Sequence, residues 1–120
     1  MQPRDAASLL DMLESARAVV TYVGQASYEE YLANDMLRAA VERRIEVIGE
    51  AARRVSDEFK RSTPQVPWQI IIARRHIIAH NYDRLANDKI FRVATTHVPT
   101  LIVALAPLIP TPPPDPLPEP

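Results

Sequence analysis

The stretch that decides the fold is DMLRAAVERRIEVIGEAARRVSDEF, residues 35–59. Its apolar side chains recur at steps of three and four residues, the spacing that places them on one side of an α-helix. We therefore predict one long helix over 35–59, packed nearly antiparallel to a neighbouring helix. Its apolar stripe is expected to consist of Leu37, Val41, Ile45, Ile48, Ala52, Val55 and Phe59.

A second helix is predicted before this stretch. The same spacing indicates a helix over 5–24, and Gly24 is a natural end for it. Ser27 and Glu30 form a capping-box pattern, which predicts a short helical turn through Tyr31. The apolar side of the first helix is expected to consist of Leu9, Leu10, Leu13, Ala16, Val20 and Val23.

Two more helices are predicted in the second half of the chain. Pro67 is well placed to begin a helix over 68–80. Asn87 or Asp88 could cap a last helix, which Pro99 should kink. We therefore predict an all-α, up-and-down bundle of four to five helices with a kinked last helix. The stripe of that helix is expected to consist of Ile90, Val93, His97, Leu101, Leu105 and Leu108.

The composition is typical of one soluble helical domain. The 120 residues are 47% hydrophobic and 24% charged and include only two glycines, which favours helices. The absence of cysteine excludes disulfides, thiolate metal sites and cysteine nucleophiles, and it fits a reducing cytoplasm. We see no signal peptide, and the proline-interrupted apolar run 98–109 is too short to span a bilayer. We expect a domain over 1–110, a disordered Pro-rich tail over 111–120, a cytoplasmic location and no membrane partner.

The charge of the chain is unevenly distributed. The formal net charge of −1 argues against a protein that grips nucleic acid along a broad surface. Residues 38–75, however, carry nine Lys or Arg against five acids, whereas residues 1–35 carry six acids against two Arg. Such a basic face could steer a phosphate chain. On charge alone we favour the simpler interpretation of a solvated helix face with Glu–Arg pairs.

The side chains most suited to chemistry lie in RRHIIAHNY, residues 74–82. An imidazole that titrates near neutrality can take the proton from a ribose 2′-hydroxyl, and a guanidinium can hold two phosphate oxygens. The stretch therefore suits RNA cleavage without a metal. Arg75 and His80 diverge by roughly 140° on an ideal helix. They could converge if the helix loosens near His80 or if the site lies in a groove between helices, and a two-fold interface would supply both a base and an acid.

A metal site is the main chemical alternative, because His76 and His80 share one helix face. The zinc-protease pattern needs a Glu directly after the first His, and Ile77 stands there instead. Only Asp83 offers a third ligand nearby. We expect no metal and no cofactor.

The sequence resembles the HepT branch of the HEPN superfamily, the toxin half of paired minimal-nucleotidyltransferase and HEPN toxin–antitoxin modules. The resemblance covers roughly residues 5–108 and rests on helix order and two motifs. AVERRIEVIGEAARRVSDEF, at 40–59, looks like the central helix of the family. VPWQIIIARRHIIAHNY, at 66–82, looks like its signature helix, in which an Arg, four residues, a His, any residue and a Tyr follow one another. Arg75, His80 and Tyr82 fill those positions.

The resemblance implies a HEPN-type bundle that forms a homodimer or a higher oligomer and acts as a metal-independent endoribonuclease toxin on RNA. His80 would be the acid/base and Arg75 the phosphate binder. A cognate nucleotidyltransferase antitoxin would AMPylate Tyr82 and so neutralise the toxin. The usual Asn after the motif Arg is His76 here, which leaves open a second acid/base or a polar spacer.

Several other residues and functions remain as alternatives. Glu50 and Arg74 could support the site together with His76, although Glu50 is more simply explained by pairing with arginines of its own helix. His97 is expected to be a core or interface residue. The alternative function is a non-catalytic, nucleotide-binding or partner subunit of a minimal nucleotidyltransferase, which the net acidity and the missing Asn favour. A purely structural helical dimer would leave residues 74–82 unexplained.

Overall fold

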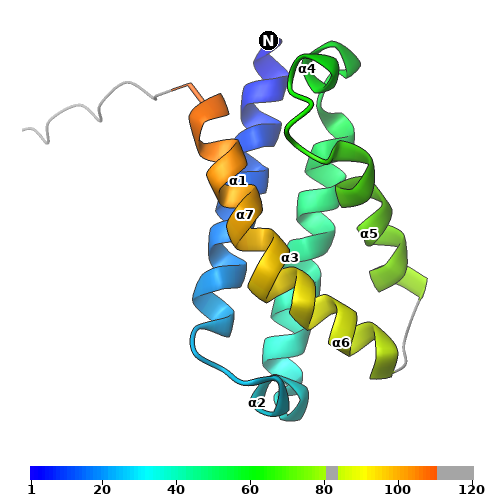
Figure 1. The fold of residues 1–120 in the computed structure, drawn as a ribbon. Helices are drawn as coiled ribbons and strands as arrows, with labels where there is room; N and C mark the ends of the chain where they lie inside the picture. Colours follow the sequence, from blue (N-terminus) through cyan, green and yellow to red (C-terminus); the bar gives the residue numbers. More distant parts are fainter. Residues whose placement is uncertain (81–83, 111–120) are drawn as a thin grey trace, which may run out of the picture.

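The structure is a computed structural model that describes the backbone of residues 1–80 and 84–110 and the side chains of residues 1–74 and 87–110. Within these ranges the secondary structure is entirely helical, which confirms the all-α prediction (Figure 1). The predicted disordered tail, 111–120, lies outside the described residues. The elements are α1 (Pro3–Val23), α2 (Tyr28–Ala33), α3 (Asp35–Arg54), α4 (Asp57–Ser62), α5 (Trp68–His80), α6 (Arg84–Arg92), the π-helical turn η1 (Val93–His97), α7 (Val98–Leu105) and the 3₁₀ turn η2 (Ala106–Leu108).

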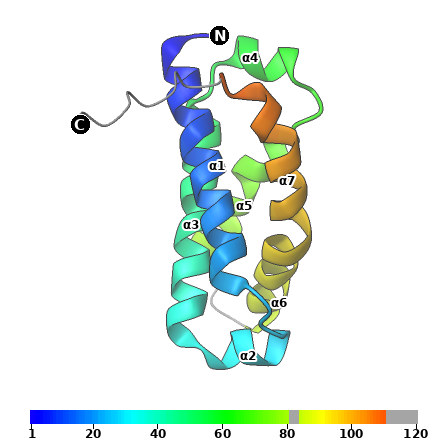
Figure 2. The ribbon, with the colours of Figure 1, turned by 90° about the vertical axis from the view of Figure 1, so that its left-hand side faces the viewer.

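The bundle is built around α3. Helix α1 runs beside α3 in the opposite direction, and α5 packs on α3 as well (Figures 1 and 2). The continuous run α6–η1–α7 returns across the bundle, and η1 and α7 contact α1. The short helices α2 and α4 cap the two ends. This arrangement confirms the predicted up-and-down bundle with a kinked last helix.

Helix α1 buries most of the predicted apolar side, because Leu9, Leu13, Ala16 and Val23 are buried, but two predicted positions are not part of it. Leu10 and Val20 are 43% and 41% exposed, whereas Met12 and Val19 are completely buried. The prediction was wrong at Leu10 and Val20, because α1 has more apolar residues than its buried face accommodates. Gly24 ends the helix as predicted, with a φ of 52° that favours glycine.

The long helix predicted over 35–59 is divided in two. Helix α3 ends at Arg54, Val55 is extended, and a separate helix, α4, begins at Asp57. Ser56 caps α4, because its hydroxyl oxygen accepts a hydrogen bond from the backbone N–H of Phe59 at 3.3 Å. A serine followed by two acids is an N-cap signal. The continuous apolar spacing concealed it.

The last helix begins earlier than predicted and is kinked as predicted. Its first helical segment starts at Arg84 and not at Asn87 or Asp88. The π-helical turn η1 ends at His97, two residues before Pro99, and the backbone N–H of Val98 bonds to the carbonyl oxygen of Val93. Pro99 has no backbone N–H, so it interrupts the ladder of α-helical hydrogen bonds. A wider, π-helical turn close to this interruption is consistent with the missing donor. The turn shifts the buried stripe, which consists of Ile90, Ala94, Val98, Leu101 and Leu105.

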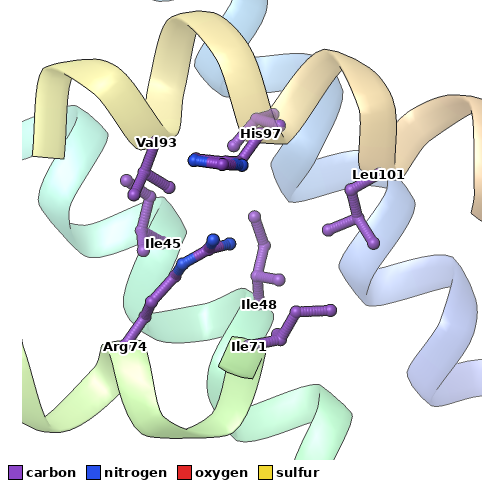
Figure 3. Close-up of a pocket in the computed structure, with 8 residues that line it drawn as sticks. Ile45, Ile48, Ile71, Arg74, Val93, His97 and Leu101 are labelled. Atoms are coloured by element: carbon purple, nitrogen blue, oxygen red, sulfur yellow. The ribbon is translucent and has the colours of Figure 1, made fainter. Parts of the chain in front are cut away.

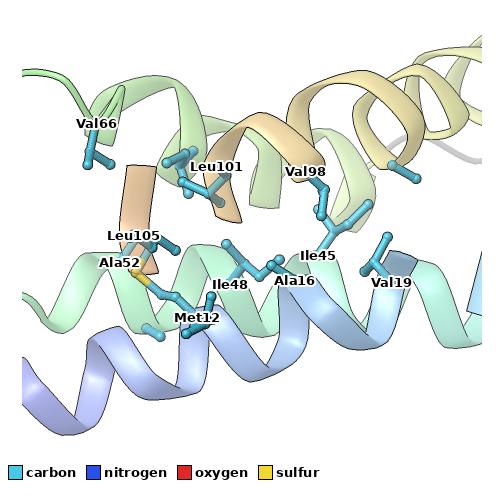
Figure 4. Packing of buried hydrophobic residues seen from close by; sticks show 14 of the residues in the cluster. Met12, Ala16, Val19, Ile45, Ile48, Ala52, Val66, Val98, Leu101 and Leu105 are labelled. Atoms are coloured by element: carbon cyan, nitrogen blue, oxygen red, sulfur yellow. The ribbon is translucent and has the colours of Figure 1, made fainter. Parts of the chain in front are cut away.

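A single hydrophobic core lies where α1, α3 and α7 meet (Figure 4). Each helix contributes small and branched side chains at the close contacts. Burial of this apolar surface is the main favourable contribution to folding. The labelled members of this core are Met12, Ala16 and Val19 from α1, Ile45, Ile48 and Ala52 from α3, Val66 from the loop before α5, and Val98, Leu101 and Leu105 from α7.

One helical run is long and apolar enough to cross a membrane by length and composition, namely Asn87–Leu108, with a mean hydropathy of 1.4. The core helix of a soluble protein passes the same test. Here Ile90, Val98 and Leu105 pack into the bundle. The expectation of no membrane partner stays a prediction.

Candidate active site

The beginning of α5 is fixed by Trp68. The indole Nε1 donates hydrogen bonds to the backbone oxygen and the hydroxyl oxygen of Thr63, both at 3.2 Å. The indole is buried and packs edge-on against the ring of Phe59, with the ring centroids 6.5 Å apart. Ile71, one turn later, is also buried. These contacts set the rotation of α5 about its axis.

Two of the three signature residues, Arg75 and His80, lie in the second half of α5. Arg75, His76 and His80 belong to this helix, while their side chains lie outside the described residues, as does Tyr82. Helix α5 continues to His80, so Arg75 and His80 are separated by about 140° around the axis and by about 7.5 Å along it. Their roles therefore stay predictions.

Arg74 is the signature-segment residue whose side chain the structure does describe. It points from α5 toward η1 and α7, where His97 points back toward it (Figure 3). Burial lowers the pKa of Arg74 below its usual value. Sequence reasoning named Arg74 as a supporting residue but did not connect it with His97. The available signal was its position three residues after Ile71, on the packed side of the helix.

Arg74 and His97 line two adjoining cavities. The inner cavity, about 10 Å³, has otherwise apolar walls. The outer cavity, about 90 Å³, adds polar side chains toward the surface. The sequence predicts that His97 is a core or interface residue. It is not a core residue, because it is exposed at the edge of these cavities, and the interface alternative stays a prediction. The outer cavity is lined by Gln65, Pro67, Ile71, Arg74, His97, Thr100, Leu101 and Ala104.

Glu50 lies on α3 and interacts with its own helix. Its carboxylate is 3.9 Å from Nη1 of Arg43, which also pairs with Glu46 at 3.3 Å. Glu50 does not line either cavity beside Arg74. The structure therefore places it in a surface charge pair, the simpler of the two roles considered for it.

An aromatic cluster supports α6, the helix that follows Tyr82 in the chain. Phe91 packs against Tyr31 and Tyr28 of α2, with centroid distances of 5.2 Å and 5.4 Å. Tyr31 is completely buried, and within the described residues its hydroxyl has no hydrogen-bond partner. Burial, with a smaller contribution from the charge of Glu42, raises the pKa of Tyr31 above its usual value.

Among the side chains the structure describes, no three His, Asp or Glu residues gather in a way that could hold a metal ion. His76, His80 and Asp83 are outside that set. The expectation of metal-free chemistry stays a prediction.

The helical bundle and the signature at the end of α5 define an all-α protein of the HEPN type. The family model described as "Ribonuclease HepT-like" matches residues 12–108, which include the whole segment 74–82. The chain belongs to this family. No solved structure matches the chain significantly.

Named relatives agree with this assignment. The chain is 35% identical over 102 residues to "Putative RNase MJ1380" of Methanocaldococcus jannaschii, covering 84% of this chain and 94% of the relative. It is 26% identical over 93 residues to "Probable ribonuclease HepT" of Thermococcus cleftensis, covering 78% of this chain and 84% of that protein. These similarities extend over most of the bundle, from the core helices to the signature.

Proposed function

We propose that this protein is the toxin of a toxin–antitoxin module and acts in the cytoplasm as a metal-independent endoribonuclease. The observation that carries the proposal is the family match over residues 12–108 together with an intact Arg, His and Tyr in the signature. The ribonuclease names of the relatives support the same activity.

The proposed reaction is transesterification at a phosphodiester. His80 takes the proton of a ribose 2′-hydroxyl, whose oxygen attacks the adjacent phosphorus while the bond from phosphorus to the 5′-oxygen breaks. A protonated imidazole returns a proton to the leaving 5′-oxygen. The products are a 2′,3′-cyclic phosphate and a 5′-hydroxyl. Arg75 binds the non-bridging oxygens and offsets the charge that develops there.

A homodimer, or a higher oligomer, is part of the proposal. One helix holds Arg75 and His80 about 140° apart, so a second copy across a two-fold axis is a simple way to place an acid, a base and a guanidinium around one phosphate. The described surface has apolar side chains available for such contacts, because Ile70 on α5 and Val103 on α7 are 55% and 74% exposed.

Control by a cognate nucleotidyltransferase completes the proposal. The Tyr82 hydroxyl oxygen attacks the α-phosphate of ATP, pyrophosphate leaves, and the phenolic proton passes to a base. The adenylate phosphate adds negative charge two residues from His80 and would repel the RNA phosphate.

The experiment is RNA cleavage in EDTA by wild type, Arg75→Ala and His80→Ala, with Arg17→Ala as a matched control because Arg17 is an exposed arginine on α1. We expect wild type and Arg17→Ala to release 2′,3′-cyclic phosphate ends. The two signature variants should lose about 10²- to 10⁴-fold in rate while their circular dichroism stays helical.

The same experiment decides against the alternative function. Wild type that is shown by mass spectrometry to be unmodified at Tyr82 and still cuts no RNA would contradict the ribonuclease proposal. A non-catalytic partner subunit of a nucleotidyltransferase would then be the better interpretation, and stable co-purification with that enzyme would support it.

A further inference from the structure

The cavities between α3, α5 and the η1–α7 segment combine apolar walls with two nitrogen-rich side chains. Ile48, Ile71 and Leu101 line the cavity beside the guanidinium of Arg74 and the imidazole of His97, which point toward one another (Figure 3). The described lining residues of the two cavities include no Asp or Glu. The guanidinium of Arg74 has therefore lost part of its hydration, and no described carboxylate in the lining compensates for that loss.

Within the part of the chain whose side chains are described, the contacts leave the donors of both side chains available. Among the described residues, neither Arg74 nor His97 takes part in an ion pair or a side-chain hydrogen bond. Thr100, which also lines the outer cavity, donates its hydroxyl hydrogen to the backbone oxygen of Thr96 at 3.1 Å. The described donors that remain for a ligand are the guanidinium, the imidazole and the amide of Gln65.

The position of His97 depends on the π-helical turn. On an uninterrupted α-helix, His97 would lie three residues after Ala94 and four before Leu101, on the buried stripe. Because η1 contains one extra residue, Val98 occupies the buried position of the stripe. His97 lies instead at the edge of the cavity, opposite Arg74. Single π-turns inside α-helices often occur at functional sites.

The volumes of the two cavities limit the size of the ligand that can bind there. The inner cavity, about 10 Å³, has room for one water molecule at most, whereas the outer cavity, about 90 Å³, holds several. That volume fits one phosphate group and is well below the roughly 300 Å³ at which pockets begin to enclose drug-sized ligands. A guanidinium matches the two non-bridging oxygens of a phosphodiester, and an imidazole N–H can share one of them.

We infer that Arg74 and His97 form a phosphate-binding subsite that holds a phosphodiester of the RNA next to the one being cleaved. This inference rests on the proposed function. Arg74 and Arg75 are consecutive in α5, and consecutive positions on an ideal helix are about 100° apart around its axis. One RNA strand can therefore present the scissile phosphate to Arg75 and a neighbouring phosphate to Arg74. Arg74 and His97 position the substrate and do not take part in bond breaking.

The test measures binding of a short 2′-O-methyl oligoribonucleotide, which lacks the attacking hydroxyl and stays intact. Fluorescence anisotropy at several salt concentrations compares wild type, Arg74→Gln, Arg74→Lys and His97→Ala, with Arg17→Gln as the matched control. We expect Arg74→Gln to weaken binding roughly ten- to hundredfold. The slope of log affinity against log salt should also fall by about 0.7, the value for one phosphate contact on a single strand.

The remaining variants separate the subsite from a structural role. Arg74→Lys should keep the wild-type slope of log affinity against log salt, because it retains the positive charge. Its affinity should lie between those of Arg74→Gln and wild type, because it loses the bidentate contact. His97→Ala should weaken binding with no change in melting temperature, since its side chain is exposed. Unchanged affinity and slope in a folded Arg74→Gln would overturn the inference.

Cleavage kinetics with unmodified RNA distinguish failure of the subsite from failure of the proposed function. The subsite predicts a higher KM with nearly unchanged kcat in Arg74→Gln. If wild type cuts RNA and Arg74→Gln has the same KM, the subsite is wrong and the ribonuclease stands. If wild type cuts nothing while oligonucleotide binding still depends on Arg74, the ribonuclease is wrong and the phosphate site stands.

Two further measurements distinguish other occupants of the cavity. Inorganic phosphate is titrated while the Arg74 Nε–H resonance is followed by nuclear magnetic resonance. Binding of free phosphate as tight as that of the oligonucleotide would assign the cavity to a small anion and contradict the RNA assignment. A fall to monomer mass in Arg74→Gln, with unchanged oligonucleotide affinity, would assign it to a carboxylate of a second copy.

Discussion

The carboxylate of Asp5, in the first turn of α1, accepts two hydrogen bonds from Ser56, which caps α4. Its Oδ1 accepts the backbone N–H at 2.7 Å and its Oδ2 accepts the hydroxyl at 2.8 Å. Oδ2 also accepts the backbone N–H of Gln2 at 3.1 Å. Asp5 is completely buried. This contact joins the beginning of the chain to the point where α3 ends, and it explains why the long predicted helix is interrupted there.

The Asp5–Ser56 contact should make folding sensitive to acid. Burial alone would raise the pKa of Asp5, but the hydrogen bonds from Ser56 and Gln2 and the charge of Arg4 outweigh it and hold the pKa below its usual value. A lowered pKa in the folded state means that the stabilisation is complete well above the usual value of about 3.9 and is lost as the pH falls through the lower, folded-state pKa.

Asp5→Asn should lower the free energy of unfolding by about 2–3 kcal/mol at pH 7, because one amide oxygen cannot replace two charged acceptors. The measurement is urea denaturation at pH 7 and at pH 3, with Asp11→Asn, an exposed carboxyl on the same helix, as the control. The difference from wild type should be smaller at pH 3. An equal difference at both pH values would show that the charge of Asp5 contributes nothing.

The buried face of α1 can be tested by truncating two neighbouring leucines. Leu9 is completely buried, whereas Leu10 is 43% exposed. We expect Leu9→Ala to destabilise the protein by about 2–5 kcal/mol and Leu10→Ala by about 1 kcal/mol or less. Thermal denaturation of both variants is sufficient. The reverse order would show that Leu10, and not Leu9, faces the core.

Trp68 should couple stability to activity. Trp68→Phe removes both hydrogen bonds to Thr63 and should lower the free energy of unfolding by about 1–2 kcal/mol. Because Trp68 sets the rotation of α5, RNA cleavage should fall even at temperatures where the variant is fully folded. Circular dichroism follows the unfolding, since Trp68 is the only tryptophan. Full RNA cleavage by the folded Trp68→Phe variant would show that the contacts of Trp68 do not position the catalytic residues.

The proposed regulation predicts a covalent change at one residue. Incubation with the cognate nucleotidyltransferase and ATP should add the mass of one adenylyl group and abolish RNA cleavage. Tyr82→Phe should neither gain mass nor lose activity. Modification of Tyr22 or Tyr28 in place of Tyr82, located by peptide mass spectrometry, would contradict the proposal.

The proposed homodimer predicts a solution mass of twice the 13.5 kDa chain. Light scattering after size-exclusion chromatography measures it directly. Replacement of the exposed Val103 on α7 by Asp tests whether this apolar face takes part, with Val20→Asp, another exposed valine, as the control. A monomeric wild type that still cuts RNA would contradict the two-fold site.

The sequence by itself determined the helical class and most helix ends. Gly24, the Ser27–Glu30 capping box and Pro67 act on their immediate neighbours through backbone conformation and local hydrogen bonds, so their effects are readable without the fold. The Arg75–His80 signature also belongs to the sequence, because it is a spacing along one helix.

The tertiary structure decided which side of each helix is buried and where two helices are interrupted. Several apolar residues compete for the core in α1, and only packing against α3 and α7 selects Leu9 over Leu10. The break at Ser56 depends on Asp5, which is distant in sequence. The facing of Arg74 and His97 depends on an extra residue in a helical turn, and the contacts between α3, α5 and α7 place the two side chains on opposite sides of one cavity. Local signals such as the Ser56 cap mark possible positions, but only long-range contacts decide which of them the fold uses.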